Sequence, residues 1–207
     1  MMLSRSLWVE VRVHICAPHV CRCTAQVDAR GNHSLSCTRS ASRQLRHSLV
    51  NDIISRALTR AKVASYKEPN GLIPGSNIRP DGATLIPWAR GKCLAWDATC
   101  PDTVAQSHLS STSGTAGAAA SHAGLLKQQK YSNLVATYIF VPVAIETFGA
   151  WNMEGLDFVA VVGRRISMVT GDIRETTFLF QRLSMAVEYD NAVSCARSLP
   201  EGADEGE

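Results

Sequence analysis

Residues 79–99 read RPDGATLIPWARGKCLAWDAT, and this stretch decides the fold that we predict for the chain. It holds two short apolar runs, 83–88 and 93–100, which a short Gly-containing turn separates. Runs of this length between turn residues are typical of β-strands joined as a hairpin. Asp81 precedes the first run and Asp97 lies in the second, with fifteen residues between them. A hairpin would let the two carboxylates converge on one site, although most aspartates at such positions are ordinary turn or surface residues.

The segments on either side of this hairpin supply further strands and helices. A strand is predicted before it, over 63–68, and a buried strand after it, over 137–146. Apolar residues recur at helical spacing in four segments, which are 41–61, 116–131, 154–169 and 176–192. Alternating apolar and polar residues over 7–15 also predict a strand. The expected fold is α/β: a helix, a three-strand meander, a helix and a strand, followed by two C-terminal helices.

Composition limits the class of protein. The 207 residues are 45% hydrophobic and 19% charged with a net charge of +3, values typical of a globular protein that is neither disordered nor membrane-spanning. We therefore expect a soluble intracellular protein without a membrane segment. It would consist of an N-terminal segment (1–38), a main domain (39–199) and an acidic tail (200–207), which we expect to be disordered. The helix over 41–61 is the most basic segment, so it is either a solvated surface or a contact for nucleic-acid phosphates.

The N-terminal segment carries a candidate metal site formed by Cys21, Cys23, His33 and Cys37. Three thiols and an imidazole suit a structural Zn²⁺ ion, which proteins bind tetrahedrally. Only one residue separates the first two cysteines, whereas zinc sites prefer at least two. Cys16 or His19 could therefore replace Cys21 as a ligand, and a set of free thiols is the simpler alternative.

The order of elements, with Pro80-Asp81 and Asp97 at the hairpin, resembles the restriction-endonuclease-like PD-(D/E)xK nucleases. That family often has a lysine two residues after the second acid, where this chain has Thr99. The chain is also similar to the C-terminal endonuclease region of non-LTR retrotransposon polyproteins, in which the lysine has moved to the next helix. The motifs that carry this likeness are the Cys-Cys-His-Cys set, Arg46-His47, the Pro-Asp pair and the stretch Lys127-Gln128-Gln129-Lys130-Tyr131.

The resemblance implies a DNA endonuclease in which Asp81 and Asp97 hold Mg²⁺ and Lys127 or Lys130 orients the attacking water. Glu68 and Glu146 end predicted strands and could add a metal contact or be solvated. DNA would be the substrate, RNA of the element a further partner, and the nucleus the location. We expect a monomer or one part of a longer polyprotein.

Two other functions stay open at this point. One is a nucleic-acid-binding module of the same fold with a decayed site, which an abrupt, truncated-looking start and the irregular cysteine spacing would favour. The other is a zinc-stabilised α/β protein without a nucleic-acid role. The nuclease hypothesis requires the carboxylates of Asp81 and Asp97 to lie near a common point that a helix lysine faces. It fails if the two side chains lie on opposite faces of the sheet.

Overall fold

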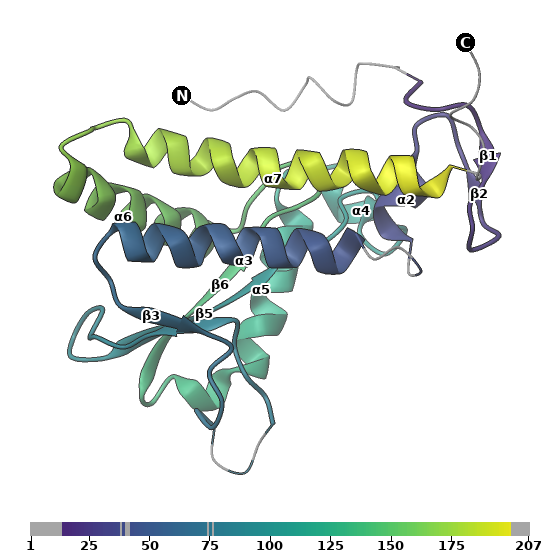
Figure 1. Ribbon diagram of the computed structural model, residues 1–207. Helices are drawn as coiled ribbons and strands as arrows, with labels where there is room; N and C mark the ends of the chain where they lie inside the picture. Colours follow the sequence, from purple (N-terminus) through teal and green to yellow (C-terminus); the bar gives the residue numbers. More distant parts are fainter. Residues whose placement is uncertain (1–13, 38, 40–41, 74, 76, 200–207) are drawn as a thin grey trace.

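A four-stranded sheet with helices on both of its faces forms the body of the protein (Figure 1). The computed structural model describes residues 14–37, 39, 42–73, 75 and 77–199. Within this part of the chain the fold is mixed α/β, with two sheets and six α-helices.

The main sheet has the strand order β3-β4-β5-β6, with bounds Ser65–Lys67, Gly82–Thr84, Cys93–Thr99 and Tyr138–Ala144. The first three strands form the antiparallel meander that the sequence predicts, and β6 runs parallel to β5. Arg90 and Gly91 both have positive φ, at 49° and 71°, which gives the two-residue turn that suits a twisted hairpin.

Strand β4 is shorter than predicted, because it ends at Thr84 rather than continuing to residue 88. The Thr84 hydroxyl accepts the backbone N–H of Leu94 at 3.0 Å and donates to the carbonyl of Ile86 at 2.8 Å. A side chain thus takes the place of the next ladder bond, and Pro87 has no N–H to resume the ladder.

Three long helices cover one face of the sheet: α3 (Ser42–Arg60), α6 (Met153–Thr170) and α7 (Glu175–Ser198) (Figure 1). All three were predicted, although α7 continues six residues beyond the predicted end at 192. The main core lies between these helices and the sheet, and the alternate β5 residues Leu94, Trp96 and Ala98 point into it.

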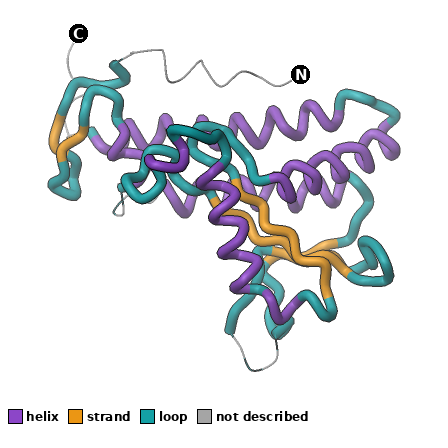
Figure 2. Tube along the Cα trace, turned by 180° about the vertical axis from the view of Figure 1, so that it is seen from behind, coloured by secondary structure: helices purple, strands orange, loops and turns teal. Residues whose placement is uncertain are grey.

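The other face carries α5 (Ala118–Lys130), which lies along the sheet and is continued by the 3₁₀ turn Ser132–Leu134 (Figure 2). A short helix, α4 (Leu109–Thr112), precedes it. A second, smaller core joins this face to α5, and its buried members are Ile73, Ala83, Ala95, Tyr131 and Leu134. Ala95 and Asp97 are two residues apart on β5, so Asp97 points towards α5 as well.

The N-terminal segment forms a small unit against the end of α7. It consists of β1 (His19–Val20), β2 (Gln26–Val27) and α2 (Asn32–Ser36), with β1 and β2 antiparallel. The hydroxyl of Ser34 donates to that of Ser198 at 2.8 Å, and His19 Nε2 lies 3.0 Å from the same oxygen. The strand predicted over 7–15 lies outside the described residues except for its last two, which are not in a strand. The acidic tail also lies outside them.

None of the helices in the described part of the chain has the length and apolar character needed to cross a membrane.

Candidate active site

Strand pairing brings the two predicted acids together. Gly82 pairs with Trp96, so continuing the antiparallel register by one residue sets Asp81 opposite Asp97. The approach is close: a Cβ at position 82 would lie 2.0 Å from the Trp96 ring. Only glycine fits there. Because glycine has no side chain, the Pro-Asp segment can lie close to β5.

Both carboxylate oxygens of Asp97 are engaged by the end of α5. The ammonium of Lys127 contacts Oδ1, and the hydroxyl of Tyr131 contacts Oδ2. These residues are four positions apart, so they lie on the same side of the helix end. The Asp97 side chain is 4% exposed, and a carboxylate this buried is stable as an ion only with such partners.

The carboxylate of Asp81 is held from the opposite side by α3 and β5. Its Oδ2 accepts the backbone N–H of Ala98 at 2.6 Å and the Nε2–H of His47 at 2.9 Å. One turn after His47, Asn51 donates to the Asp81 carbonyl at 3.4 Å and accepts the indole N–H of Trp96 at 2.9 Å. Within the described part of the chain, no hydrogen bond reaches Oδ1 of Asp81.

The charges at this site influence one another. The hydrogen bond to Asp81 is the largest cause of a raised pKa of His47, and the negative charges of Asp81 and Asp97 raise this pKa further. Burial of the imidazole and the positive charge of Lys127 act in the opposite direction. Burial and the hydrogen bond to Asp97 raise the pKa of Tyr131, so its hydroxyl keeps its proton. The His47 and Lys127 side chains are 38% and 24% exposed, so the carboxylate site is accessible to solvent on the side of these two residues. Two acids, an amine, an imidazole and a phenol thus share one accessible site.

The structure distinguishes the two candidate lysines. Lys127 contacts Asp97, whereas Lys130 is exposed and its ammonium lies 4.8 Å from the centre of the Tyr131 ring. Thr99, where the nuclease family often has its lysine, pairs with Ala144 in the sheet. Lys127 therefore places an amine beside Asp97, whereas position 99 does not.

His47 and Tyr131 were not among the predicted site residues. A histidine on a basic helix and a tyrosine after two lysines resemble surface residues until the tertiary fold is known. Both nevertheless lie within motifs of the resemblance, Arg46-His47 and the Lys-x-x-Lys-Tyr stretch. The motifs were the available signal, but they do not show what each side chain contacts.

Glu146 is buried, contrary to the solvated strand end that was one alternative from the sequence. Its buried carboxylate accepts the backbone N–H groups of Ala119 at 2.9 Å and Ala120 at 3.2 Å, and the hydroxyl of Thr103 at 3.1 Å. It thus satisfies free donors in the first turn of α5, the helix that carries Lys127.

Glu68 is exposed, and its carboxylate lies 3.6 Å from Arg79.

Two of the arginines of the basic helix α3 are used in contacts within the protein. Arg46 is 1% exposed, and its Nε donates to Asp190 of α7 at 2.9 Å. Arg60 pairs with Glu175 at the start of the same helix. These two arginines connect α3 to α7, and Arg46 is too buried to contact a phosphate from solvent.

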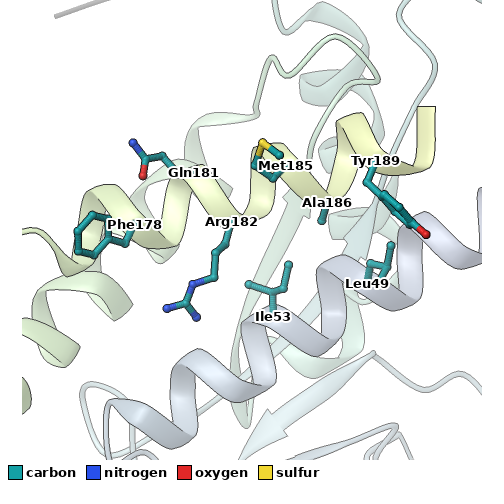
Figure 3. Close-up of a pocket in the computed structure, with 8 residues that line it drawn as sticks. All are labelled: Leu49, Ile53, Phe178, Gln181, Arg182, Met185, Ala186 and Tyr189. Carbon is teal, nitrogen blue, oxygen red and sulfur yellow. The ribbon is translucent and has the colours of Figure 1, made fainter. Parts of the chain in front are cut away.

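A groove of about 540 Å³ lies between α3 and α7, and neither Asp81 nor Asp97 lines it (Figure 3). Its lining is mostly apolar and contains no carboxylate: Leu49, Ile53, Phe178, Gln181, Arg182, Met185, Ala186 and Tyr189. A groove with this lining offers no carboxylate ligand for a hard cation.

The N-terminal Cys3His cluster assembles from the four residues that the sequence predicts. The ligand atoms of Cys21, Cys23, His33 and Cys37 all lie within 4.8 Å of one another. The sulfurs of Cys21 and Cys37 are 3.8 Å apart, and Cys23 Sγ lies 3.0 Å from His33 Nε2. Ligands about 2.3 Å from a tetrahedral zinc ion are separated by about 3.8 Å, so the cluster could bind zinc.

The two alternative ligands considered for this cluster are used elsewhere. Cys16 Sγ donates to the carbonyl of Asp28 at 3.5 Å, and His19 Nε2 lies against Ser198. The spacing of one residue between Cys21 and Cys23 is accommodated by a turn in which Thr24 adopts a φ of 77°. The backbone N–H of Ala25, together with the neighbouring ligand side chains, lowers the pKa of the Cys23 thiol to about 6. A thiolate is the form that binds zinc.

Neither a protein-family model nor a curated protein matches this chain. The geometry of the two sites and the resemblance of their motifs are therefore the features that point to a function.

Proposed function

We propose that the chain is a divalent-cation-dependent endonuclease domain that hydrolyses phosphodiester bonds in DNA. The observation that carries the proposal is the convergence of Asp81 and Asp97 beside the ammonium of Lys127 at a solvent-accessible site. The similarity of these motifs to the endonuclease region of non-LTR retrotransposons supports DNA as the substrate and the nucleus as the place of action.

The donor set fits a magnesium ion. Mg²⁺ prefers carboxylate oxygens, usually takes one or two of them from the protein, and keeps several waters. Oδ1 of Asp81 receives no hydrogen bond from the described residues, and Asp97 lies opposite it in the sheet. When bound, such an ion supplies charge neutralisation at the phosphate and a water of lowered pKa.

The protein's own groups would do the rest of the work. The positively charged side chain of Lys127 is 24% exposed at the site. There it can stabilise a phosphate oxygen or orient the attacking water. His47 and the Ala98 N–H both hold Oδ2 of Asp81, which leaves its other oxygen without a hydrogen bond from the described residues. We also propose that Cys21, Cys23, His33 and Cys37 hold a structural zinc ion, since the protein fills all four positions.

The test is nicking of supercoiled plasmid DNA with and without Mg²⁺. We expect Mg²⁺-dependent nicking, and we expect Asp97→Asn to lower its rate by on the order of 10²–10³-fold. Asp172→Asn is a matched control, because this aspartate lies in the α6–α7 loop and pairs with Arg174. It should keep the wild-type rate.

Two outcomes would contradict the proposal. Equal nicking by Asp97→Asn would show that the activity does not come from this site. Wild-type protein that binds DNA but does not nick it would instead favour the non-catalytic binding module of the same fold.

A further inference from the structure

Tyr131, the residue after α5, contacts both halves of the candidate site. Its side chain is fully buried, and its hydroxyl lies 2.7 Å from the carbonyl of Arg79 and in contact with Oδ2 of Asp97. Arg79 is two residues before Asp81. One phenol oxygen therefore connects the strand that carries the second acid to the segment that carries the first.

The ring of Tyr131 is packed so tightly that its hydroxyl has little freedom. The ring is part of the smaller core with Ala83, Ala95 and Leu134, and its centre lies 4.6 Å from that of Phe140. Packing of this kind fixes a side chain in one rotamer. The hydroxyl is thus held in place by the core and not by the carboxylate that it contacts.

This arrangement constrains the orientation of Asp97. Tyr131 takes Oδ2 while Lys127 takes Oδ1, so the carboxylate plane is set by two groups from one helix end. The two contacts are not equivalent, because Lys127 is 24% exposed on a flexible side chain whereas Tyr131 is buried. Lys127 can leave Asp97 for another partner while Tyr131 stays.

We propose that Tyr131 is a positioning residue, whose hydroxyl orients Asp97 and sets its spacing from Asp81, and so determines how well the pair binds a divalent cation. The proposal rests on the proposed function, because it concerns the same cation site. Partners that orient metal ligands typically change metal affinity or activity by about 10–100-fold when removed. A tyrosine that served only the core would have no such effect once its ring was kept.

Tyr131→Phe separates the two roles, because it keeps the ring and removes the hydroxyl. Tyr189→Phe is the matched control, since Tyr189 is 61% exposed on α7 in the groove of Figure 3. Full-length proteins, loaded with one equivalent of zinc, would be titrated with Mn²⁺ by isothermal calorimetry. Plasmid nicking would be measured over a range of Mn²⁺ concentrations, and thermal unfolding would show that each variant is folded.

We expect Tyr131→Phe to remain folded at the assay temperature, to bind Mn²⁺ about 10-fold more weakly and to need correspondingly more Mn²⁺ for half-maximal nicking. Tyr189→Phe should match the wild type in both measurements. Tyr131→Leu, which also removes the ring, should lose thermal stability in addition. A shift in Mn²⁺ dependence without a matching change in unfolding is the signature that a purely structural role would not give.

The outcomes distinguish this proposal from the proposed function. Wild type and Tyr131→Phe with equal Mn²⁺ affinity and equal nicking would overturn the role of Tyr131 and leave the nuclease intact. Wild type that binds Mn²⁺ through Asp97 but does not nick would overturn the nuclease, and the affinity of Tyr131→Phe would still decide the role of Tyr131. Wild type that binds no Mn²⁺ at millimolar concentration would overturn both.

Discussion

The Cys3His cluster and the carboxylate site are two candidate metal sites built in opposite ways. The first takes all four ligands from residues 21–37, close in sequence and directed only at one another. The second collects its groups from β5, α3, α5 and the segment before β4. In the second site the acids are also bound by protein groups: His47 on Asp81, and Lys127 and Tyr131 on Asp97.

The difference corresponds to two kinds of chemistry. A metal site in which protein ligands occupy all four coordination positions suits a structural ion. A catalytic metal site keeps a coordination position open for water or substrate. At the carboxylate site, Oδ1 of Asp81 has no hydrogen bond from the described residues, and Lys127 is partly exposed. The cluster should therefore control local folding, and the carboxylate site should control reactivity.

The largest expected effect is the loss of the N-terminal fold when zinc is removed. The hydrophobic cluster of this segment has three buried members, Cys21, Val27 and Cys37, two of which are candidate zinc ligands. So small a core does not hold a fold without a metal. We expect Cys37→Ser to lose its single zinc ion and to lose amide protection over 14–37, as measured by elemental analysis and by hydrogen exchange with mass spectrometry.

The control for this experiment is Cys93→Ser, which changes a thiol of β5 outside the cluster and should retain the zinc. If the two sites are independent, Asp97-dependent nicking by Cys37→Ser should fall by less than about 10-fold, since no ligand of the carboxylate site is touched. A Cys37→Ser protein that kept one zinc ion per chain would show that the cluster is not a zinc site.

The second prediction disturbs the carboxylate site and leaves the cluster alone. Gly82→Ala would place a methyl group 2.0 Å from the ring of Trp96. This ring is fully buried, and its N–H donates a hydrogen bond to Asn51. The ring cannot move aside, so β4 must separate from β5. We expect a loss of about 3 kcal/mol in the free energy of unfolding, as overpacking costs when no neighbour can yield.

Urea unfolding measures this loss, and Gly114→Ala is the matched control because the nearest atom to its added Cβ is 3.9 Å away. Gly82→Ala should still bind zinc where it remains folded. An unchanged unfolding midpoint would mean that the segment at Gly82 does not lie in close contact with Trp96. The convergence of Asp81 with Asp97 would then lose its support.

Local patterns predicted the elements of the main domain and the members of the Cys3His cluster well, because hydrophobic periodicity and short-range spacing encode them. The hairpin turn at Arg90-Gly91, the order of the helices and the four residues of the Cys3His cluster all depend on neighbours in sequence. The choice between Lys127 and Lys130 does not, since both lie in the last turn of α5. Only the position of the helix against β5 shows which of them reaches Asp97.

The errors concern polar residues that are buried by tertiary contacts. Glu146 and Arg46 read as solvated or functional because charged side chains are seldom buried. Each is buried here with a partner distant in sequence: Glu146 with the start of α5, and Arg46 with Asp190. His47 and Tyr131 escaped attention for the same reason, because their roles depend on contacts 34 residues away in sequence.

The smallest effect we predict compares one thiol from each region. In the zinc-free protein, the pKa of Cys23 is lowered to about 6, first of all by the Ala25 N–H, whereas burial raises the pKa of Cys100, at the end of the site strand, to about 12. The thiolate is the reactive form, so at pH 7 Cys23 is mostly reactive and Cys100 is almost entirely protonated.

Iodoacetamide at pH 7 should therefore modify Cys23 at least about 10-fold faster than Cys100, even though a thiol of low pKa is a weaker nucleophile. Lowering the pH from 7 to 5 should slow Cys23 by about 10-fold as its thiolate is protonated. Zinc should protect Cys23 and leave Cys100 unchanged, because only Cys23 belongs to the cluster. Peptide mass spectrometry over time measures the modification rate of each thiol under each condition. Zinc protection of both thiols would mean that the cluster and the β5 strand are coupled after all, whereas protection of Cys23 alone would confirm that the two sites are built independently.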